Sequence, residues 1–282
     1  MLKRISIALI AGLFVGGGSV FFIWRWQQGL KPIPVDVSSS VADLIATAPA
    51  AEPIITPKPE ATPEPTLIPE PAPEPTPDPE ATPSSSVSIP AKFLIENVPF
   101  VSQAPTRNWD MPFQEACEEA SVLMVNRFYT QKPLPSVEEL DQIIIDMTVW
   151  GVEEMAGKVD TNVKTTARYF TEYLEYDAAR VSVVYDMTLN DIKAVIASGR
   201  PVIVPAAGRD LGNENFVEPG PLYHMLVIVG YDQDEFITND PGTRKGEGYR
   251  YKQQVLYDAI HDLPATKEQI REGRKAMIVV SR

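Results

Sequence analysis

Residues 224–243, HMLVIVGYDQDEFITNDPGT, hold two short apolar runs on either side of the polar tip DQDE. The runs at 225–229 and 236–238 have the length and composition of β-strands, and a polar tip between two such runs is typical of a hairpin. A hairpin folded about this tip brings Asp240 back toward His224 at the same end of the sheet, offset diagonally by a few residues. The stretch therefore predicts two adjacent antiparallel strands with a carboxylate near a histidine.

Further strands and several helices are expected on either side of this hairpin. Apolar runs at 201–205 and 276–280 are bounded by turn-forming residues and predict strands. Residues 117–129, CEEASVLMVNRFY, repeat apolar residues at helical spacing, so a helix is expected to begin at or just before Cys117. Four more helices are expected, after the capping-box patterns Ser136 with Glu139 and Thr188 with Asp191 and near 161–174 and 253–261. Helices that come first and strands that come later, without regular βαβ alternation, favour an α+β fold with an antiparallel sheet.

Cys117 is the only cysteine of the chain and is a candidate nucleophile. At the first turn of a helix, unpaired backbone N–H groups and the helix dipole favour the thiolate over the thiol. Glu118 and Glu119 follow directly, and their charge opposes the thiolate unless both side chains point into water. The alternative is an inert, buried cysteine, since free cysteines are often buried.

A thiol nucleophile needs a base, and the chain has two histidines. His224 opens a predicted strand and is the candidate base, whereas His261, late in a predicted helix, is expected to be a surface or capping residue. Asp240 is the candidate that orients the imidazole ring, with Asn239 in reserve if the register slips by one. Asp-Pro-Gly is also a common turn sequence, so Asp240 could belong to a plain turn.

Acyl transfer also needs donors for the oxyanion of the intermediate. The backbone N–H of Cys117 is one candidate, and Gln114 and Gln103 compete for the second position because spacing alone does not choose between them. One central histidine and scattered carboxylates do not form a metal-ligand set, so neither a metal nor another cofactor is expected.

With these residues in view, the last part of the chain resembles the C39-like cysteine peptidases, a branch of the papain-like fold. The resemblance rests on NVPFVSQ (97–103), on QEACEEASVLMV (114–125) and on HMLVIVGYD followed by FITNDPGT. It implies an N-terminal helical part that carries Cys117, packed on a C-terminal antiparallel sheet that carries His224 and Asp240, with an upstream glutamine at the oxyanion hole. Many relatives have Cys-Gly-Pro at the nucleophile, whereas here the cysteine precedes two glutamates.

The N-terminus is expected to be a membrane anchor. Residues 5–24 carry no charge and are long enough to cross a bilayer as a helix, and Lys3 and Arg4 precede them. The bias of positive charge toward the cytoplasm leaves residues 1–31 as a cytoplasmic tip and transmembrane anchor, with the rest of the chain outside the cytoplasm. A cleaved signal peptide is the alternative.

Residues 32–90 are rich in proline and glutamate and are expected to form a disordered, extended linker. They contribute much of the net charge of −13, and this acidity argues against a nucleic-acid partner. The peptidase-like domain is then expected at 91–282, a usual size for one core.

These features favour a peptidase acting on a peptide or protein substrate. Two alternatives use the same residues or the same fold. One is an amidase acting on cell-wall peptides through the same cysteine and histidine, and the other is a surface binding module without activity.

Overall fold

The computed structural model describes residues 89–155, 157 and 159–282. The expected anchor at 1–31 lies outside the described residues, as does the expected linker at 32–90 except for its last two residues. In the described part of the chain, no helix has both the length and the apolar character needed to cross a membrane.

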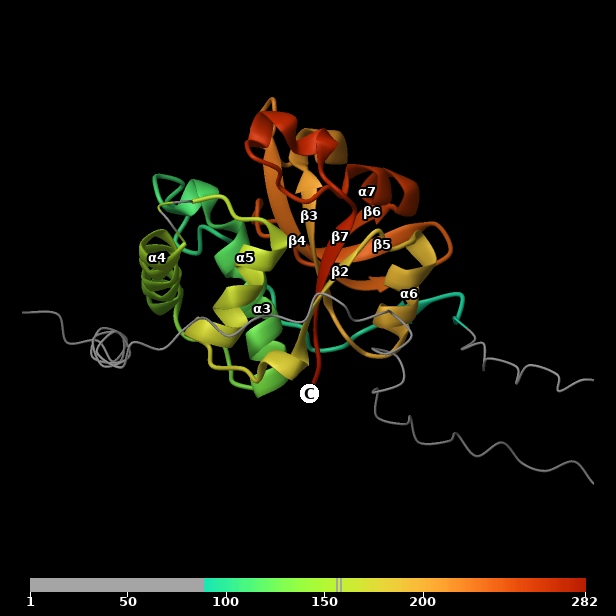
Figure 1. Cartoon of the computed structure of the whole chain (residues 1–282), viewed down its shortest axis with the longest axis horizontal. Helices are drawn as coiled ribbons and strands as arrows, with labels where there is room; N and C mark the ends of the chain where they lie inside the picture. Colours follow the sequence, from blue (N-terminus) through green and yellow to red (C-terminus); the bar gives the residue numbers. More distant parts are fainter. Residues whose placement is uncertain (1–88, 156, 158) are drawn as a thin grey trace, which may run out of the picture.

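The described residues form one antiparallel sheet in the order β2-β7-β3-β4-β5-β6, with β1 paired to β4 (Figure 1). The strands are β1 (Phe93–Leu94), β2 (Val181–Tyr185), β3 (Val202–Ala207), β4 (Tyr223–Tyr231), β5 (Glu235–Asn239), β6 (Tyr249–Lys252) and β7 (Ala276–Val280). The predicted strands are confirmed, while β1, β2 and β6 were not predicted. Together with the helices below, this antiparallel sheet confirms the α+β class.

The expected helices are confirmed with small shifts of their ends. They are α3 (Cys117–Thr130), α4 (Val137–Glu154), α5 (Val163–Arg168), α6 (Leu189–Ala197) and α7 (Gln253–Ala259). A π-helical turn, η2 (Tyr169–Tyr173), continues α5, and short 3-10 helices lie at η1 (Phe113–Glu115), η3 (Ala178–Arg180), η4 (Gly208–Leu211) and η5 (Lys267–Glu272). Both capping boxes form, since Ser136 and Thr188 each accept a hydrogen bond from the backbone N–H three residues on.

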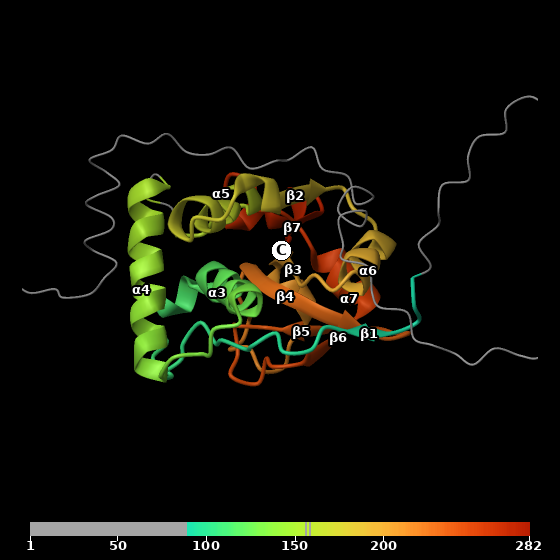
Figure 2. The same cartoon turned by 90° about the horizontal axis from the view of Figure 1, so that it is seen from below.

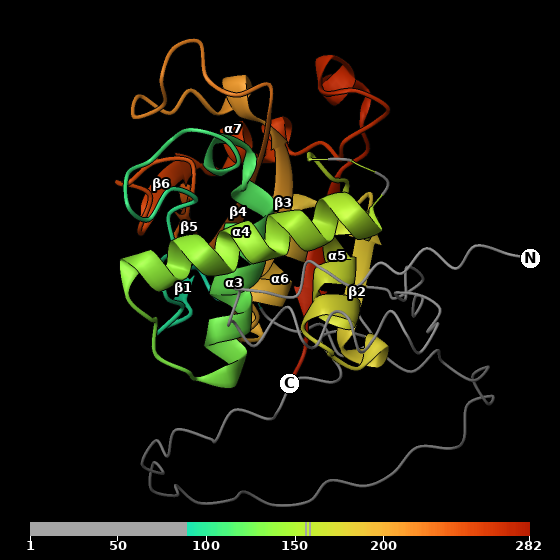
Figure 3. The same ribbon diagram turned by 90° about the vertical axis from the view of Figure 1, so that its left-hand side faces the viewer.

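Helices cover both faces of the sheet. Figure 2 shows α3, α4 and α5 on one side and α6 with α7 on the other, and Figure 3 shows α4 crossing in front of α3. Every residue of β4 is buried, and its side chains alternate between two apolar clusters, with Met225 in one and Leu226 in the other. The central strand therefore has the character of a fully covered strand, buried on both faces.

The predicted hairpin is β4 followed by β5. Val227 lies opposite Asn239 and Ile228 opposite Thr238, with a bulge nearer the tip. One further step of this register puts Asp240 opposite Leu226, two residues along β4 from His224. The diagonal offset expected from the sequence is thus the one found.

Candidate active site

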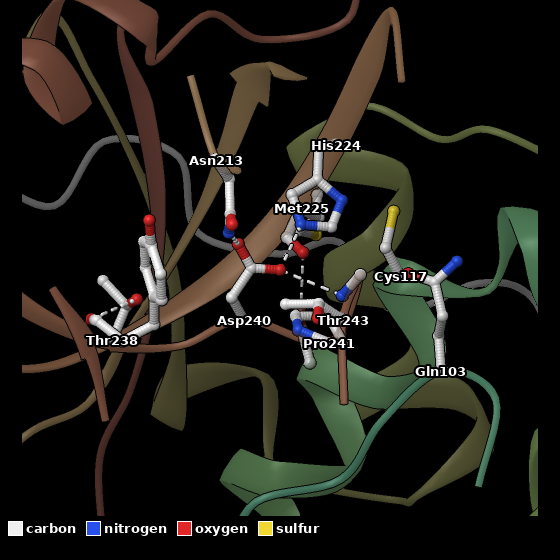
Figure 4. A network of polar contacts seen from close by, with 12 residues as sticks. Gln103, Cys117, Asn213, His224, Met225, Thr238, Asp240, Pro241 and Thr243 are labelled. Atoms are coloured by element: carbon white, nitrogen blue, oxygen red, sulfur yellow. Dashed lines mark hydrogen bonds and ion pairs between the residues drawn. The ribbon is translucent and has the colours of Figure 1, made fainter. Parts of the chain in front are cut away.

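Cys117 is the first residue of α3. The helix has no side-chain cap, and its first turn is closed by the N–H of Ala120, which donates to the carbonyl of Ala116. The cysteine side chain is nearly buried and lies at the end of α3 that faces β4 and the turn after β5 (Figure 4). The helix start thus brings the sulfur to the end of the sheet where His224 lies.

His224 and Asp240 are in direct contact, with 2.7 Å between Nε2 of the ring and Oδ1 of the carboxylate. Because an ionised carboxylate only accepts hydrogen bonds, Nε2 is the donor. In a neutral ring Nδ1 is then the unprotonated nitrogen, and Figure 4 shows the second ring nitrogen on the side of the Cys117 sulfur. The structure therefore brings the three residues together in the order sulfur, imidazole, carboxylate.

Asp240 is completely buried, and both of its oxygens are bound. Oδ1 also accepts from the N–H of Gly242 at 2.9 Å, while Oδ2 accepts from the hydroxyl of Tyr251 at 2.6 Å and from the amide of Asn213 at 3.4 Å. Burial acts to raise the pKa of this carboxyl group, but the charge of His224 and these hydrogen bonds outweigh it. The net result is a lowered pKa, so the carboxylate is ionised at neutral pH.

Asn213 and Tyr251, which hold the far side of Asp240, were not predicted from the sequence. Asn213 belongs to the stretch 208–223, whose glycines, prolines and asparagines indicate only a loop. Tyr251 lies on β6, and the alternation in YRYK could have predicted that strand. Nothing local in either segment indicates a contact with Asp240, because both contacts join segments that are distant in sequence.

The imidazole ring is also held by packing. Phe216 meets it edge-on, with 5.3 Å between ring centroids. Gly242 leaves room for it, since a Cβ at that position would lie 2.7 Å from Cε1 of His224. The ring is thus confined by an aromatic ring, by a close backbone and by its bond to Asp240.

The two candidate glutamines lie in different surroundings. Gln103 is buried beside Cys117, and its Nε2 donates to the carbonyl of Phe113 at 2.9 Å (Figure 4). A primary amide has two N–H groups, so a second donor remains on this nitrogen. Gln114 is exposed on η1. The structure therefore places Gln103, and not Gln114, beside the sulfur in a buried position.

Asn239, the reserve candidate for orienting the ring, has a different position. Its amide nitrogen donates to the carbonyl of Val98 at 3.1 Å, and its oxygen accepts from the N–H of Gly248. It therefore ties the N-terminal segment to the turn after β5 and does not contact the imidazole. His261, expected late in a helix, follows the end of α7 and is half-buried, with its Nδ1 2.7 Å from the carbonyl oxygen of Gly273.

The charge of the two glutamates after Cys117 would not oppose a thiolate only if both side chains pointed into water. They do not. Glu118 is fully buried, and Glu119 is 2% exposed. The sulfur donates a hydrogen bond to Oε2 of Glu118 at 3.0 Å. Burial, followed by the charge of Glu118, raises the pKa of the Cys117 thiol well above its ordinary value, so the helix terminus alone does not yield a thiolate.

Glu119 sits beside this pair without touching the sulfur. Its Oε1 accepts a hydrogen bond from the hydroxyl of Tyr169 at 2.5 Å. Burial raises its pKa to about 7, against the opposing effect of that hydrogen bond. Among the described residues, no group of three or more histidine, cysteine, aspartate or glutamate side chains is arranged to hold a metal ion.

Comparison with known proteins gives one matching family, and several solved structures align with the chain. The sequence model of the Peptidase_C39 like family matches residues 95–263, a span that contains Cys117, His224 and Asp240. No curated protein matches the chain.

Three solved structures align with the chain at low identity. A Bacillus anthracis protein assigned to the C39-like peptidases aligns at 15% identity and a TM-score of 0.44, covering 68% of this chain and 98% of its own. Xylellain, a cysteine protease from Xylella fastidiosa, aligns at 14% identity and a TM-score of 0.38, covering 71% of this chain and 90% of its own. Digestive procathepsin L 3 from the larval midgut of Tenebrio molitor aligns at 11% identity and a TM-score of 0.41, covering 71% of this chain and 72% of its own.

Replacement of Tyr251 by phenylalanine tests how Asp240 is held. The change removes the hydroxyl that donates to Oδ2, a hydrogen bond to a charged group, and should reduce the free energy of unfolding at neutral pH by about 1–3 kcal/mol. Because the pKa of Asp240 is lowered in the folded protein, its stabilising effect is complete above the unfolded pKa and is lost as pH falls through the folded one. The difference between Tyr251→Phe and wild type should therefore shrink below about pH 4.

The measurement is chemical denaturation at several pH values. Tyr249→Phe is the matched control, because its hydroxyl donates to the exposed Glu214 from the same strand. A loss of stability that is equal for the two variants, or independent of pH, would contradict this account of Asp240.

Proposed function

Because the chain belongs to the Peptidase_C39 like family, we propose that it is a cysteine peptidase with Cys117 as nucleophile, His224 as base and Asp240 as the residue that orients the imidazole. The contact of 2.7 Å between Nε2 of His224 and Oδ1 of Asp240 carries the proposal. It fixes the proton of the neutral ring on Nε2 and leaves Nδ1 to accept the proton of the sulfur.

The reaction begins when Nδ1 of His224 takes the Sγ proton of Cys117. The ionised Asp240 stabilises the imidazolium that forms, and burial of this pair strengthens the attraction between the two charges. The thiolate then attacks the carbonyl carbon of a peptide bond, and the carbonyl oxygen becomes an oxyanion. This ion pair compensates for surroundings that otherwise disfavour a thiolate.

Two donors are proposed for the oxyanion. One is the backbone N–H of Cys117 at the start of α3, and the other is the second N–H of the Gln103 amide. Its first N–H, bound to the carbonyl of Phe113, keeps the amide in place before substrate arrives. Gln114, exposed on η1, is not proposed for this role.

Collapse of the intermediate completes the cycle. The imidazolium gives its Nδ1 proton to the leaving amine, and the C–N bond breaks to leave a thioester on Cys117. Water, deprotonated by His224, attacks this thioester and releases the new carboxylic acid and the free thiol. The substrate class proposed is therefore a peptide or protein, with cell-wall peptides as the class to test beside it.

We also propose that the domain works outside the cytoplasm on a membrane tether. The uncharged run at 5–24, the preceding Lys3 and Arg4, and the proline-rich stretch at 32–90 support this setting. A proline-rich spacer is stiff and extended, so it would hold the domain away from the bilayer.

His224→Ala should slow alkylation of the chain by iodoacetamide. Without the imidazole the thiolate loses the imidazolium that stabilises it, so the thiolate fraction falls at least about tenfold, the equivalent of one pKa unit. Since Cys117 is the only cysteine, the alkylated residue is known without peptide mapping. His261→Ala, which removes the second histidine, is the control and should react as wild type does, and equal rates in all three proteins would count against the proposed site.

Gln103→Ala should lower kcat for peptide hydrolysis by about 10²–10³ with a smaller change in KM, because the donor acts on charge that develops in the transition state. Gln114→Ala is the matched control and should retain wild-type kcat. Both are measured on a peptide found by screening a library, with Cys117→Ser as the inactive reference. A larger loss in Gln114→Ala than in Gln103→Ala would reverse this assignment, and release of fragments from peptidoglycan without cleavage of the library would favour the amidase.

The full chain expressed in cells should remain in the membrane fraction after carbonate extraction, and protease added to intact cells should release the domain. A chain that lacks residues 5–24 should lose both properties, because the apolar run is the proposed anchor. Recovery of the full chain in the soluble fraction, or of a mature form that begins after residue 24, would exclude a permanent anchor.

A further inference from the structure

The hydrogen bond made by the Cys117 sulfur goes to the neighbouring glutamate. Sγ lies 3.0 Å from Oε2 of Glu118, and the other oxygen of that carboxyl group accepts the backbone N–H of Thr161 at 2.8 Å. Glu118 is fully buried. Its carboxyl group is therefore fixed against the reacting atom on one side and against the main chain on the other.

The groups that face Glu118 are mainly acidic or phenolic. They come from several elements: Cys117 and Glu119 belong to α3, Asp160 lies before α5, Tyr169 belongs to η2 and Tyr223 to β4. Lys267 of η5 brings a positive charge to these acidic residues, since its Nζ lies 3.1 Å from Asp160 and 3.2 Å from Glu115.

These surroundings favour the neutral form of Glu118. Burial, and then the charge of Glu119, raises the pKa of the Glu118 carboxyl well above its usual range, while the bonds from Cys117 and Thr161 only partly offset this. A buried acid of this kind keeps its proton to higher pH than an exposed glutamate does.

We propose that Glu118 controls the ionisation of the nucleophile: as a carboxylate it holds the Sγ proton of Cys117, and as a neutral acid it donates its own O–H to the thiolate. In the second state the Sγ proton moves to Nδ1 of His224, the Glu118 proton stays on its oxygen, and no proton leaves the site. In the first state an ionised sulfur would lie 3.0 Å from a second negative charge, so the thiol persists.

This inference rests on the proposed function for the role of His224 as proton acceptor. Its consequence is a pH dependence of a particular direction. As pH rises through the pKa of Glu118, the carboxyl loses its proton, the thiolate loses its donor and gains a repelling charge, and the reactivity of Cys117 falls. A sulfur governed by its own ionisation alone would become more reactive as pH rises.

The test is the rate of iodoacetamide alkylation from about pH 5 to pH 9 in the full chain, where the thiolate displaces iodide and forms an S–C bond. The wild-type rate should show a falling limb. In Glu118→Gln the amide keeps a donor for the sulfur and an acceptor for Thr161 but cannot ionise, so the falling limb should be absent and the rate near pH 8 should exceed wild type by about tenfold.

Glu119→Gln is the matched control, because it removes a buried acid from the next position of the same helix turn without touching the sulfur. Because Glu118 is still present and can ionise, this variant should keep a falling limb. Glu118→Ala removes both charge and donor, so it should lose the wild-type limb but react more slowly than Glu118→Gln. Circular dichroism establishes that each variant is folded, and Glu118→Ala tests the charge if Glu118→Gln does not fold.

Two results would overturn the inference. One is a wild-type rate that only rises with pH, and the other is a Glu118→Gln or Glu118→Ala profile that superimposes on wild type. Alkylation needs no substrate, so a chain without peptidase activity still reports on Glu118. Failure of the proposed function would instead be seen as unchanged alkylation in His224→Ala.

Discussion

The site depends on the hydrogen bond between His224 and a carboxylate that is fully buried. Removing an ionised carboxylate from solvent costs several kcal/mol unless hydrogen bonds replace those of water. For Asp240 the replacements come from separate segments of the chain, namely Asn213 in the loop before β4, His224 in β4, Gly242 in the turn after β5 and Tyr251 in β6. If this end of the sheet were arranged so that one of these donors was lost, the buried charge of Asp240 would lack a hydrogen bond that water would otherwise supply. The same requirement that stabilises the end of the sheet therefore also fixes the imidazole ring.

The turn that carries Asp240 also positions the segment before α3. The N–H of Gln103 donates to the carbonyl of Pro241 at 3.0 Å, and the amide of Asn239 donates to the carbonyl of Val98. The positions of Asp240 and Gln103 are thus set by neighbouring residues of one turn. This explains how side chains more than a hundred positions apart keep a fixed relation, and it gives Asn239 a structural part in the site although it does not touch the ring.

The features that were predictable from the sequence are those determined by local pattern. The hairpin around 224–243, the start of a helix at Cys117 and both capping boxes follow from periodicity and from side chains within a few residues. The choice between Gln103 and Gln114 was not predictable, because it depends on the path of a segment that pairs with a distant turn. The burial of Glu118 was not predictable for a different reason. Charged side chains are mostly exposed, and the hydrogen bond that Glu118 accepts from the backbone of Thr161 joins segments that no local pattern connects.

Two carboxyl groups of the site show that equal burial can end in opposite pKa shifts when the neighbouring groups differ. Asp240 and Glu118 are both fully buried, yet the pKa of the first is lowered and that of the second is raised. Asp240 faces an imidazole that can become a cation, together with hydroxyl and amide donors, whereas Glu118 faces a thiol and further acids with a backbone N–H as the compensating donor. One group is therefore suited to remain charged beside an imidazolium and the other to carry a proton beside a sulfur. Groups whose surroundings drive their pKa values apart can divide acid and base roles within one site. Here the two carboxyl groups differ in their partners, because Asp240 contacts the imidazole of His224 and Glu118 contacts the sulfur of Cys117.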